Sequence, residues 1–248
     1  METLYLLGEQ DRIVGVSGYA VRPPQVRREK PRVSAFISAD IPKILALEPD
    51  LVLAFSDLQA DIVADLVRAG VAIHVFNQRD VAGILAMIRT LGALVGAAER
   101  ADQLAASYEQ RLANIASTAR PSPKPKVYFE EWDDPLISGI GWVSELIEIA
   151  GGEDILPTLR FQQAAKNRII SPDVVRAAAP DVILASWCGK KVRKATIAGR
   201  PGWADVPAVR DGHVYEIKSP LILQPGPAAL TDGLDAIVKA LWPALPGS

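Results

Sequence analysis

The chain has 248 residues, 49% of them apolar and 23% charged, with a formal net charge of −2 and an isoelectric point of about 5.8. This composition is typical of a globular protein with one large domain or two lobes that each have a core. The small negative charge excludes a phosphate-neutralising surface, so nucleic acid is not an expected partner.

The opening segment, METLYLLGEQDRIVGVS, lacks the basic start, the apolar core and the cleavage site of a secretory signal. No later stretch reaches the roughly 20 consecutive apolar residues that cross a membrane as a helix. Taken alone, these features predict a soluble chain with no export address and no membrane span.

The first half alternates predicted strands with predicted helices. Strands are expected at Ile13–Val16, Leu51–Phe55 and Ala72–Phe76, and helices near Ala60–Ala69 and Val81–Leu94. Alternation of this kind predicts parallel sheets flanked by helices on both faces.

A further helix is expected just before the second of these strands. Asp40 can cap it, Pro42 lies in its first turn, and Pro49 stops it. Because Leu51–Phe55 is continuously apolar, we expect that strand to be covered on both faces.

One long amphipathic helix is expected at Ala97–Arg120, where small and apolar residues recur every three or four positions. A helix of this length spans roughly 36 Å at 1.5 Å per residue, and the prolines of 121–125 prevent its continuation. The sequence therefore predicts an N-terminal α/β lobe at 1–96, an interlobe helix at 97–120 and a C-terminal α/β lobe at 121–248.

The second half repeats the pattern of the first. Strands are expected at Val127–Glu130, Val182–Ala185 and Val214–Ile217, and helices near Trp142–Ala150, Pro172–Ala178 and Ala228–Leu241. Ser171 caps a helix 131 residues after Asp40, and Pro180-Asp181 follows Pro49-Asp50 by the same interval. Two lobes of similar plan explain this echo, and a chance recurrence of a common helix-to-strand turn is the alternative.

No catalytic motif is present, so we expect a protein that is not an enzyme. The patterns GxSxG, GxGxxG and GxxxxGK[ST] do not occur. The single cysteine, Cys188, excludes an intrachain disulfide and is expected to be a buried structural thiol. The two histidines, His74 and His213, lie in apolar strands rather than in a ligand cluster, so no metal site is expected.

The order and spacing of several segments resemble the class III substrate-binding proteins of ABC importers, which bind cobalamin, ferric siderophores or haem. The resemblance is greatest to the cobalamin-binding proteins. It is carried by DRIVGVSGYAVRPPQ (Asp11–Gln25), IPKILALEPDLVLAF (Ile41–Phe55), SGIGWVSELIEIAGGEDIL (Ser138–Leu156), SPDVVRAAAPDVILAS (Ser171–Ser186) and RPGWADVPAVRDGHVYEI (Arg200–Ile217).

This resemblance implies two α/β lobes joined by one long helix, with the ligand held between them by loops at the carboxyl ends of the strands. Two aromatic positions that flank the corrin in cobalamin binders carry over, as Tyr19 and Phe36. The other two correspond to Leu136 and Asn167, which are not aromatic. Cobalamin, or another metal chelate, is thus the implied ligand, and no resident cofactor is expected.

Other side chains could line the same ligand site. Trp132, Trp142 and Trp187 lie at strand ends or in a first helical turn, whereas Trp203 is expected in the core. Arg168, with Lys166, could meet anionic groups of a ferric siderophore.

The acidic stretch FEEWDDP allows two interpretations. Its carboxylates, those of Glu130, Glu131, Asp133 and Asp134, either accept hydrogen bonds from ligand amides or form a solvated loop.

The family resemblance also implies permease subunits as partners, docked through one carboxylate on each lobe. Asp173 keeps that charge in the second lobe, and Pro42 replaces it in the first, where Asp40 or Asp61 could serve instead. The alternative role of Asp173 is that of a favourable acid in a helical first turn.

The resemblance implies a periplasmic location and an opening strand and export signal upstream of Met1. The expected function is therefore delivery of a corrinoid to an ABC importer. The alternatives are a ferric-siderophore or haem binder of the same superfamily, or a cytoplasmic chelate-binding module, because this chain begins without a signal peptide.

Overall fold

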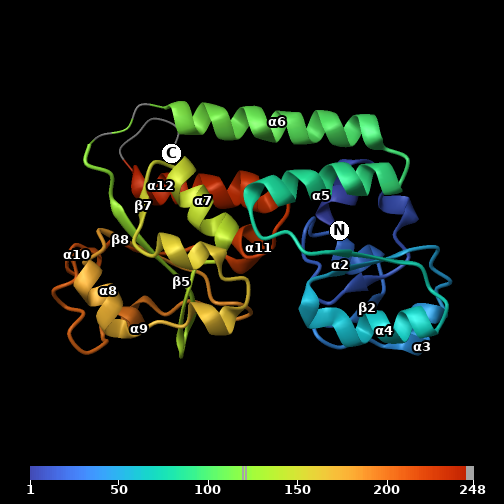
Figure 1. The fold of residues 1–248 in the computed structure, drawn as a ribbon, viewed down its shortest axis with the longest axis horizontal. Helices are drawn as coiled ribbons and strands as arrows, with labels where there is room; N and C mark the ends of the chain where they lie inside the picture. The colour runs from blue at the N-terminus through green and yellow to red at the C-terminus, as the bar shows by residue number, and fades with distance from the viewer. Residues whose placement is uncertain (119, 121, 244–248) are drawn as a thin grey trace. The chain divides into compact units, whose positions relative to one another are not determined.

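A computed structural model describes residues 1–118, 120 and 122–243 of the chain. Contacts divide it into two compact units, each of which combines helices with parallel strands. Unit 1 comprises Met1–Gln78 and Ala86–Ala105, and unit 2 comprises Arg79–Leu85 and Ala106–Ser248. The expected α/β class and its division into two lobes are confirmed (Figure 1).

Unit 1 contains two separate two-stranded parallel sheets, β1–β2 and β3–β4. Short helices surround them in Figure 1. Its first eight elements other than 3₁₀ turns are α1 (Glu2–Leu6), β1 (Val16–Ser17), α2 (Val26–Glu29), β2 (Arg32–Ser34), α3 (Ile41–Leu45), β3 (Val52–Phe55), α4 (Ala60–Arg68) and β4 (Ile73–Phe76).

The strands of unit 1 differ from expectation in two respects. The strand expected at Ile13–Val16 begins only at Val16, where pairing with Arg32 of β2 begins, although the backbone is already extended at Ile13. β3 was expected to be covered on both faces, but only its Ala54 is buried. A sheet of two strands with little cover leaves the remaining side chains of β3 half-exposed.

The predicted helix caps are confirmed in both copies of the repeat. Asp40 accepts a hydrogen bond from Lys43 N–H at 3.0 Å and begins α3, while Ser171 accepts from Asp173 N–H at 3.2 Å and begins α8 (Pro172–Ala178). Each helix is followed by a parallel strand, β3 or β8 (Val182–Ala185).

Two longer helices connect the units along the chain, α5 (Val81–Leu94) and α6 (Ala98–Ser117). The first residues of α5 belong to unit 2 and the rest to unit 1, and α6 changes unit after Ala105. The expected single connector at 97–120 is thus observed as α6, but α5 also passes from one unit to the other. The division at residues 96 and 120 therefore differs from the one that the contacts give.

Unit 2 is built on a five-stranded sheet of order β6-β5-β8-β9, with β7 also paired to β5. All pairs are parallel except β5–β6. The elements not yet given are β5 (Lys126–Asp133), β6 (Leu136–Ser138), α7 (Gly141–Ile149), β7 (Glu153–Asp154), α9 (Lys194–Ala198), α10 (Pro207–Arg210), β9 (Val214–Glu216), α11 (Ser219–Ile222) and α12 (Leu234–Leu241), the last preceded by a π-helical turn at Ala229–Gly233.

One face of this sheet carries a hydrophobic cluster that includes Tyr128, Ile183, Trp187 and Trp203. Trp203 is fully buried, so its expected place in the core is confirmed. Cys188 is exposed, and the expected burial of its thiol is wrong because β8 ends at Ala185 and a turn toward solvent begins three residues later, at Cys188.

Among the described residues, no helix is both long and apolar enough to cross a lipid bilayer.

Candidate functional site

The loops that follow the strands of unit 1 expose apolar side chains at the carboxyl ends of those strands. Tyr19 follows β1 and is 51% exposed, and Phe36 and Ile37 follow β2 at 37% and 70%. Leu58, after β3, is 61% exposed. Large apolar side chains gathered at one edge of parallel strands are typical of a ligand-binding surface.

Hydrogen bonds hold these loops together. The side-chain amide of Gln59 donates to the Phe36 carbonyl at 2.7 Å, and its oxygen accepts from Phe55 N–H at 2.8 Å. A bridge between Ser34 and Ala39 closes the turn that carries Phe36. The loops after β2 and β3 are therefore adjacent and fixed, which presents Phe36 on a defined backbone.

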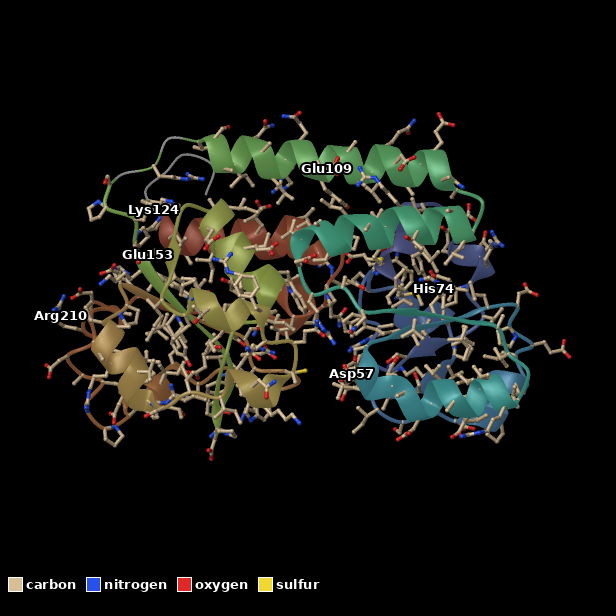
Figure 2. All side chains as sticks on the ribbon, in the orientation of Figure 1. Asp57, His74, Glu109, Lys124, Glu153 and Arg210 are labelled. Carbon is tan, nitrogen blue, oxygen red and sulfur yellow. The ribbon has the colours of Figure 1, made fainter. Side chains whose placement is uncertain are left out.

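The turn after β3 adopts a sterically restricted conformation. Ser56 has a φ of +70°, is 2% exposed, and accepts a hydrogen bond from Leu58 N–H at 3.3 Å. Non-glycine residues seldom adopt positive φ, and such positions cluster at functional loops. The turn borders an open depression of about 400 Å³ lined by Ser56, Asp57, Ala60, Val63, Ala64, Val75 and Asn77, and Asp57 is labelled in Figure 2.

The acidic stretch of unit 2 is neutralised by cations of the same unit. Fully buried Glu130 accepts two hydrogen bonds from the Arg200 guanidinium, at 2.6 and 2.9 Å, and one from Trp187 Nε1 at 3.0 Å. Glu131 pairs with Arg168 at 2.6 Å, and Asp133 with Lys190 at 2.5 Å. Neither interpretation of the stretch fits these three carboxylates, because they are committed to internal ion pairs; Asp134 is exposed.

Arg168 serves as an internal clamp and is not available to an anionic ligand. Its side chain is 1% exposed and also donates to the Ser138 carbonyl. Its neighbours Lys166 and Asn167 are exposed, so only they present side chains to solvent from this turn.

The tryptophans expected at the ligand site differ in exposure. Trp132 is half-buried, and its ring lies 4.1 Å from the Lys190 ammonium. Trp187 and Trp142 are 3% and 2% exposed, and the indole N–H of Trp142 donates to the Ile222 carbonyl at 2.8 Å. Leu136 is likewise buried. Leu136, Trp142 and Trp187 therefore lie in the interior of unit 2 and not on its surface.

The carboxylates expected at a docking surface are all exposed. Asp173 lies in the first turn of α8, where its side chain is 74% exposed and forms an ion pair with Arg176 at 3.1 Å. Asp40 caps α3 and Asp61 lies in the first turn of α4. Each carboxylate is thus at a helix N-terminus, where the helix dipole favours a negative charge.

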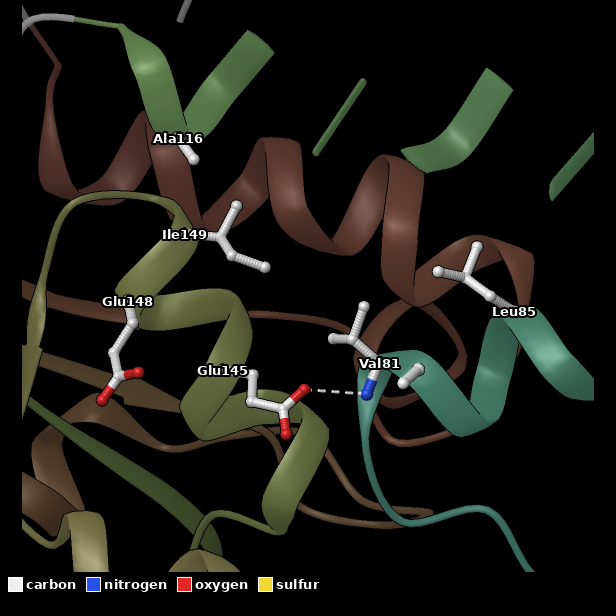
Figure 3. A pocket seen from close by; sticks show the side chains of 7 residues that line it. Val81, Leu85, Ala116, Glu145, Glu148 and Ile149 are labelled. Atoms are coloured by element: carbon white, nitrogen blue, oxygen red, sulfur yellow. Dashed lines mark hydrogen bonds between the residues drawn. The ribbon is translucent and has the colours of Figure 1, made fainter. Parts of the chain in front are cut away.

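A second depression, of about 510 Å³, lies within unit 2 and was not anticipated from the sequence (Figure 3). Glu145 of α7 lines it and accepts a hydrogen bond from Val81 N–H, the first residue of α5, at 2.8 Å. Burial raises the pKa of the Glu145 carboxyl, while this hydrogen bond opposes the shift. The carboxylate thereby fixes the start of α5 on α7.

No group of three or more histidine, cysteine or carboxylate side chains able to hold a metal ion occurs in the part of the chain that the structure describes. His74 packs on Phe76, with ring centroids 4.4 Å apart, and is labelled in Figure 2. His213 lies 3.2 Å from the Tyr215 hydroxyl. Each histidine is thus packed against an aromatic neighbour.

Comparison with known proteins places this geometry in a family. Residues 1–221 match the family model described as periplasmic binding protein. Over 98% of its length the chain is 26% identical to the uncharacterized ABC transporter substrate-binding lipoprotein YvrC of Bacillus subtilis, of which it covers 77%. It is also 26% identical to a cobalamin-binding protein of Halobacterium salinarum, over 91% of this chain and 63% of that protein.

Solved structures show the same architecture. The apo form of the periplasmic heme-binding protein RhuT from Roseiflexus sp. RS-1 aligns with a TM-score of 0.80 and 26% identity, covering 97% of this chain and 95% of that one. The periplasmic vitamin B12 binding protein BtuF of Vibrio cholerae aligns with a TM-score of 0.76 and 25% identity, covering 97% and 92%.

Proposed function

Because the chain belongs to the periplasmic binding protein family, we propose that it is the substrate-binding component of an ABC importer and captures a corrinoid for delivery to the permease. Its relatives are substrate-binding and vitamin B12-binding proteins, not enzymes. This agreement supports a carrier role. That the carried ligand is a corrinoid is the more specific part of the proposal.

The observation that carries the proposal is the pair of exposed aromatic rings at the carboxyl edge of unit 1. Tyr19 and Phe36 occupy the two positions that carry over from the cobalamin binders, and both side chains reach solvent. Flat rings bury much area with few rotamers to immobilise, so they suit a broad, flat macrocycle. Ile37 extends the same apolar surface.

Unit 2 exposes fewer of the side chains that the sequence predicts for ligand contact. Half-buried Trp132 and exposed Asn167 are the members of the predicted set that we retain for ligand contact. We assign Leu136, Trp142, Arg168 and Trp187 to the interior of unit 2. All four are buried, and Trp142, Arg168 and Trp187 donate hydrogen bonds to partners in that unit.

A haem is the second candidate ligand. The heme-binding protein RhuT aligns over nearly the whole chain with an identity as high as that of the cobalamin binders. A ferric siderophore stays a weaker alternative, since Arg168, which was expected to meet its anionic groups, is engaged by Glu131.

We further propose an extracytoplasmic location and a permease partner. The relatives are named as periplasmic proteins or as a lipoprotein, and none of these names favours the cytoplasmic alternative. Asp173 on unit 2 and Asp40 or Asp61 on unit 1 are the carboxylates that would orient the chain on the permease.

Binding measurements on the purified chain test this function. All five tryptophans lie in unit 2, so a bound chromophore should quench their fluorescence saturably when cyanocobalamin or hemin is added. Replacing Tyr19 and Phe36 by alanine should weaken binding at least about tenfold, since two aromatic contacts are lost.

A matched control replaces Leu6 and Val67, which are also exposed apolar residues of unit 1, by alanine. This variant should bind like the parent. The proposal fails if neither chelate nor a ferric siderophore binds, and the assigned surface fails if the two variants bind equally well.

A further inference from the structure

A short basic loop at the carboxyl edge of the unit 2 sheet carries cations that form no ion pair with any carboxylate of the described residues. The loop comprises residues 190–193, between β8 and α9, and α9 begins at Lys194; the sequence from Lys191 reads KVRK. The buried Glu130 and the adjacent carboxylates already have cationic partners, so the charge of this loop is not needed to balance them.

The loop is fixed at three places. Lys190 forms its ion pair with Asp133 and lies over the rings of Trp132 and Trp187, 4.1 and 5.0 Å from their centroids. Val192 is buried in the hydrophobic cluster, and its N–H donates to the Glu216 carboxylate at the end of β9, at 3.3 Å. These contacts place the loop over the carboxyl ends of β5 and β9.

The side chains of the loop differ in their surroundings. Lys190 contacts Asp133 and two indole rings, and Val192 is buried. Lys191 and Arg193, on either side of Val192, are exposed. The ammonium of Lys194 lies 5.4 Å from the Tyr215 ring centroid.

The charge balance of this edge is positive. Among the described residues, Lys191, Arg193 and Lys194 form no ion pair. Glu216 is paired with Lys218 at 2.8 Å, and the nearby charge of Lys191 also helps to lower the pKa of the Glu216 carboxyl. Asp134 is a carboxylate at this edge that forms no ion pair with the described residues. A fixed loop that presents unpaired cations next to the half-buried indole of Trp132 suits a ring system with carboxylates at its periphery.

We infer that the transported chelate bears carboxylate side chains and that Lys191 and Arg193 bind them. This inference rests on the proposed function, because it concerns the side chains of the chelate that the carrier binds. The inference predicts tighter binding of macrocycles with free carboxylic acids than of macrocycles whose side chains are esters or amides.

Two matched pairs of ligands test it, hemin against its dimethyl ester and cobyrinic acid against its heptamethyl ester. Each acid should bind at least about tenfold more tightly than its ester, and the difference should shrink as salt screens the charges. Replacing Lys191 and Arg193 by glutamine should remove most of this preference and leave ester binding within about twofold of the parent.

The control variant replaces Lys124 and Lys126 by glutamine. These exposed lysines precede and begin β5, at the opposite edge of the same sheet, and Lys124 is labelled in Figure 2. The net charge changes equally, so the acid preference should persist in the control.

Each outcome has a distinct meaning. Equal binding of acids and esters by the parent overturns the inference and leaves the carrier function intact. An acid preference that survives in the Lys191/Arg193 variant overturns the assignment to this loop. Failure of all four macrocycles to bind overturns the inference, and the proposed function falls with it only if cyanocobalamin and a ferric siderophore also fail to bind.

Discussion

Glu130 and Arg200 form a buried ion pair whose contribution to stability depends on both partners. The Glu130 side chain is fully buried and that of Arg200 is 12% exposed. We expect Arg200→Met to lower the free energy of unfolding by about 3–5 kcal/mol, because an unpaired carboxylate would stay in the core. Urea unfolding followed by tryptophan fluorescence measures this for unit 2.

The second variant of this pair separates charge from packing. Adding Glu130→Gln to Arg200→Met removes the buried charge and keeps an acceptor for the Trp187 indole N–H. The double variant should therefore recover much of the lost stability. If it is no more stable than Arg200→Met alone, the loss came from packing and not from the uncompensated carboxylate.

Glu145 should give the fold a measurable pH dependence. Burial raises its pKa above the ordinary 4.5, so between that value and its higher folded pKa the folded state binds more protons than the unfolded state. Stability contributed by the protonated carboxyl is present at low pH and is lost as pH rises through the folded pKa. The pKa of the Asp154 carboxyl is raised for the same reason, so Glu145 supplies only part of the fall in stability with rising pH.

The Glu145→Gln variant isolates the contribution of Glu145 to the pH dependence of stability. Glutamine can still accept from Val81 N–H, but it does not titrate, so the variant should lose less stability than the parent as pH rises above 4.5. Unfolding curves at a series of pH values provide the test. Parallel pH profiles for the two proteins would show that the Glu145 carboxyl does not titrate differently in the folded state.

At the scale of elements, helices α5 and α6 approach each other closely within unit 1. A Cβ at Gly92 would lie 2.1 Å from the Ala101 Cβ and 3.1 Å from the Ala97 carbonyl oxygen. Gly92→Ala should therefore destabilise the chain by about 1–3 kcal/mol through overpacking. Thermal unfolding would detect this loss as a lower midpoint.

Two further variants make this prediction specific. Gly226→Ala adds a Cβ that meets no atom within 4 Å, and it should have little effect. Ala101→Gly in the Gly92→Ala background should restore part of the stability by removing the clashing methyl group. No restoration would mean that the α5–α6 approach is not the cause.

The elements that the sequence predicted well carry local signals. Asp40 and Ser171 are helix caps followed by a proline within two residues, and Val182–Ala185 is a continuous apolar run. Residues close by in the sequence therefore specify these elements. β1 was misplaced because its extended segment contains only Val16 and Ser17. A strand so short gives no periodicity to detect.

The candidate site was predicted less completely, because its decisive contacts are distant in sequence. Glu130 meets Arg200 across 70 positions, and Arg168 meets Glu131 across 37. No local pattern indicates which carboxylate finds which cation. Tyr19 and Phe36 came from family resemblance, and their exposed position after strands is consistent with that origin.

For the whole molecule, delivery to a permease adds a requirement beyond ligand binding. Asp173→Lys should weaken association with the permease severalfold, because an exposed rim charge tunes encounter and orientation. Ligand affinity should stay unchanged. Arg176, the present partner of Asp173, provides the control, since Arg176→Gln should not weaken association. Equal permease affinity of Asp173→Lys and the parent would leave Asp173 as a helix-start residue only.

The proposed function depends most on contact between the carboxyl edge of unit 1 and a flat chelate. A crystal structure of the chain with bound cyanocobalamin or hemin tests this directly. We predict a macrocycle whose face is in van der Waals contact with the rings of Tyr19 and Phe36. A macrocycle bound elsewhere, with both rings still in solvent, would contradict the account.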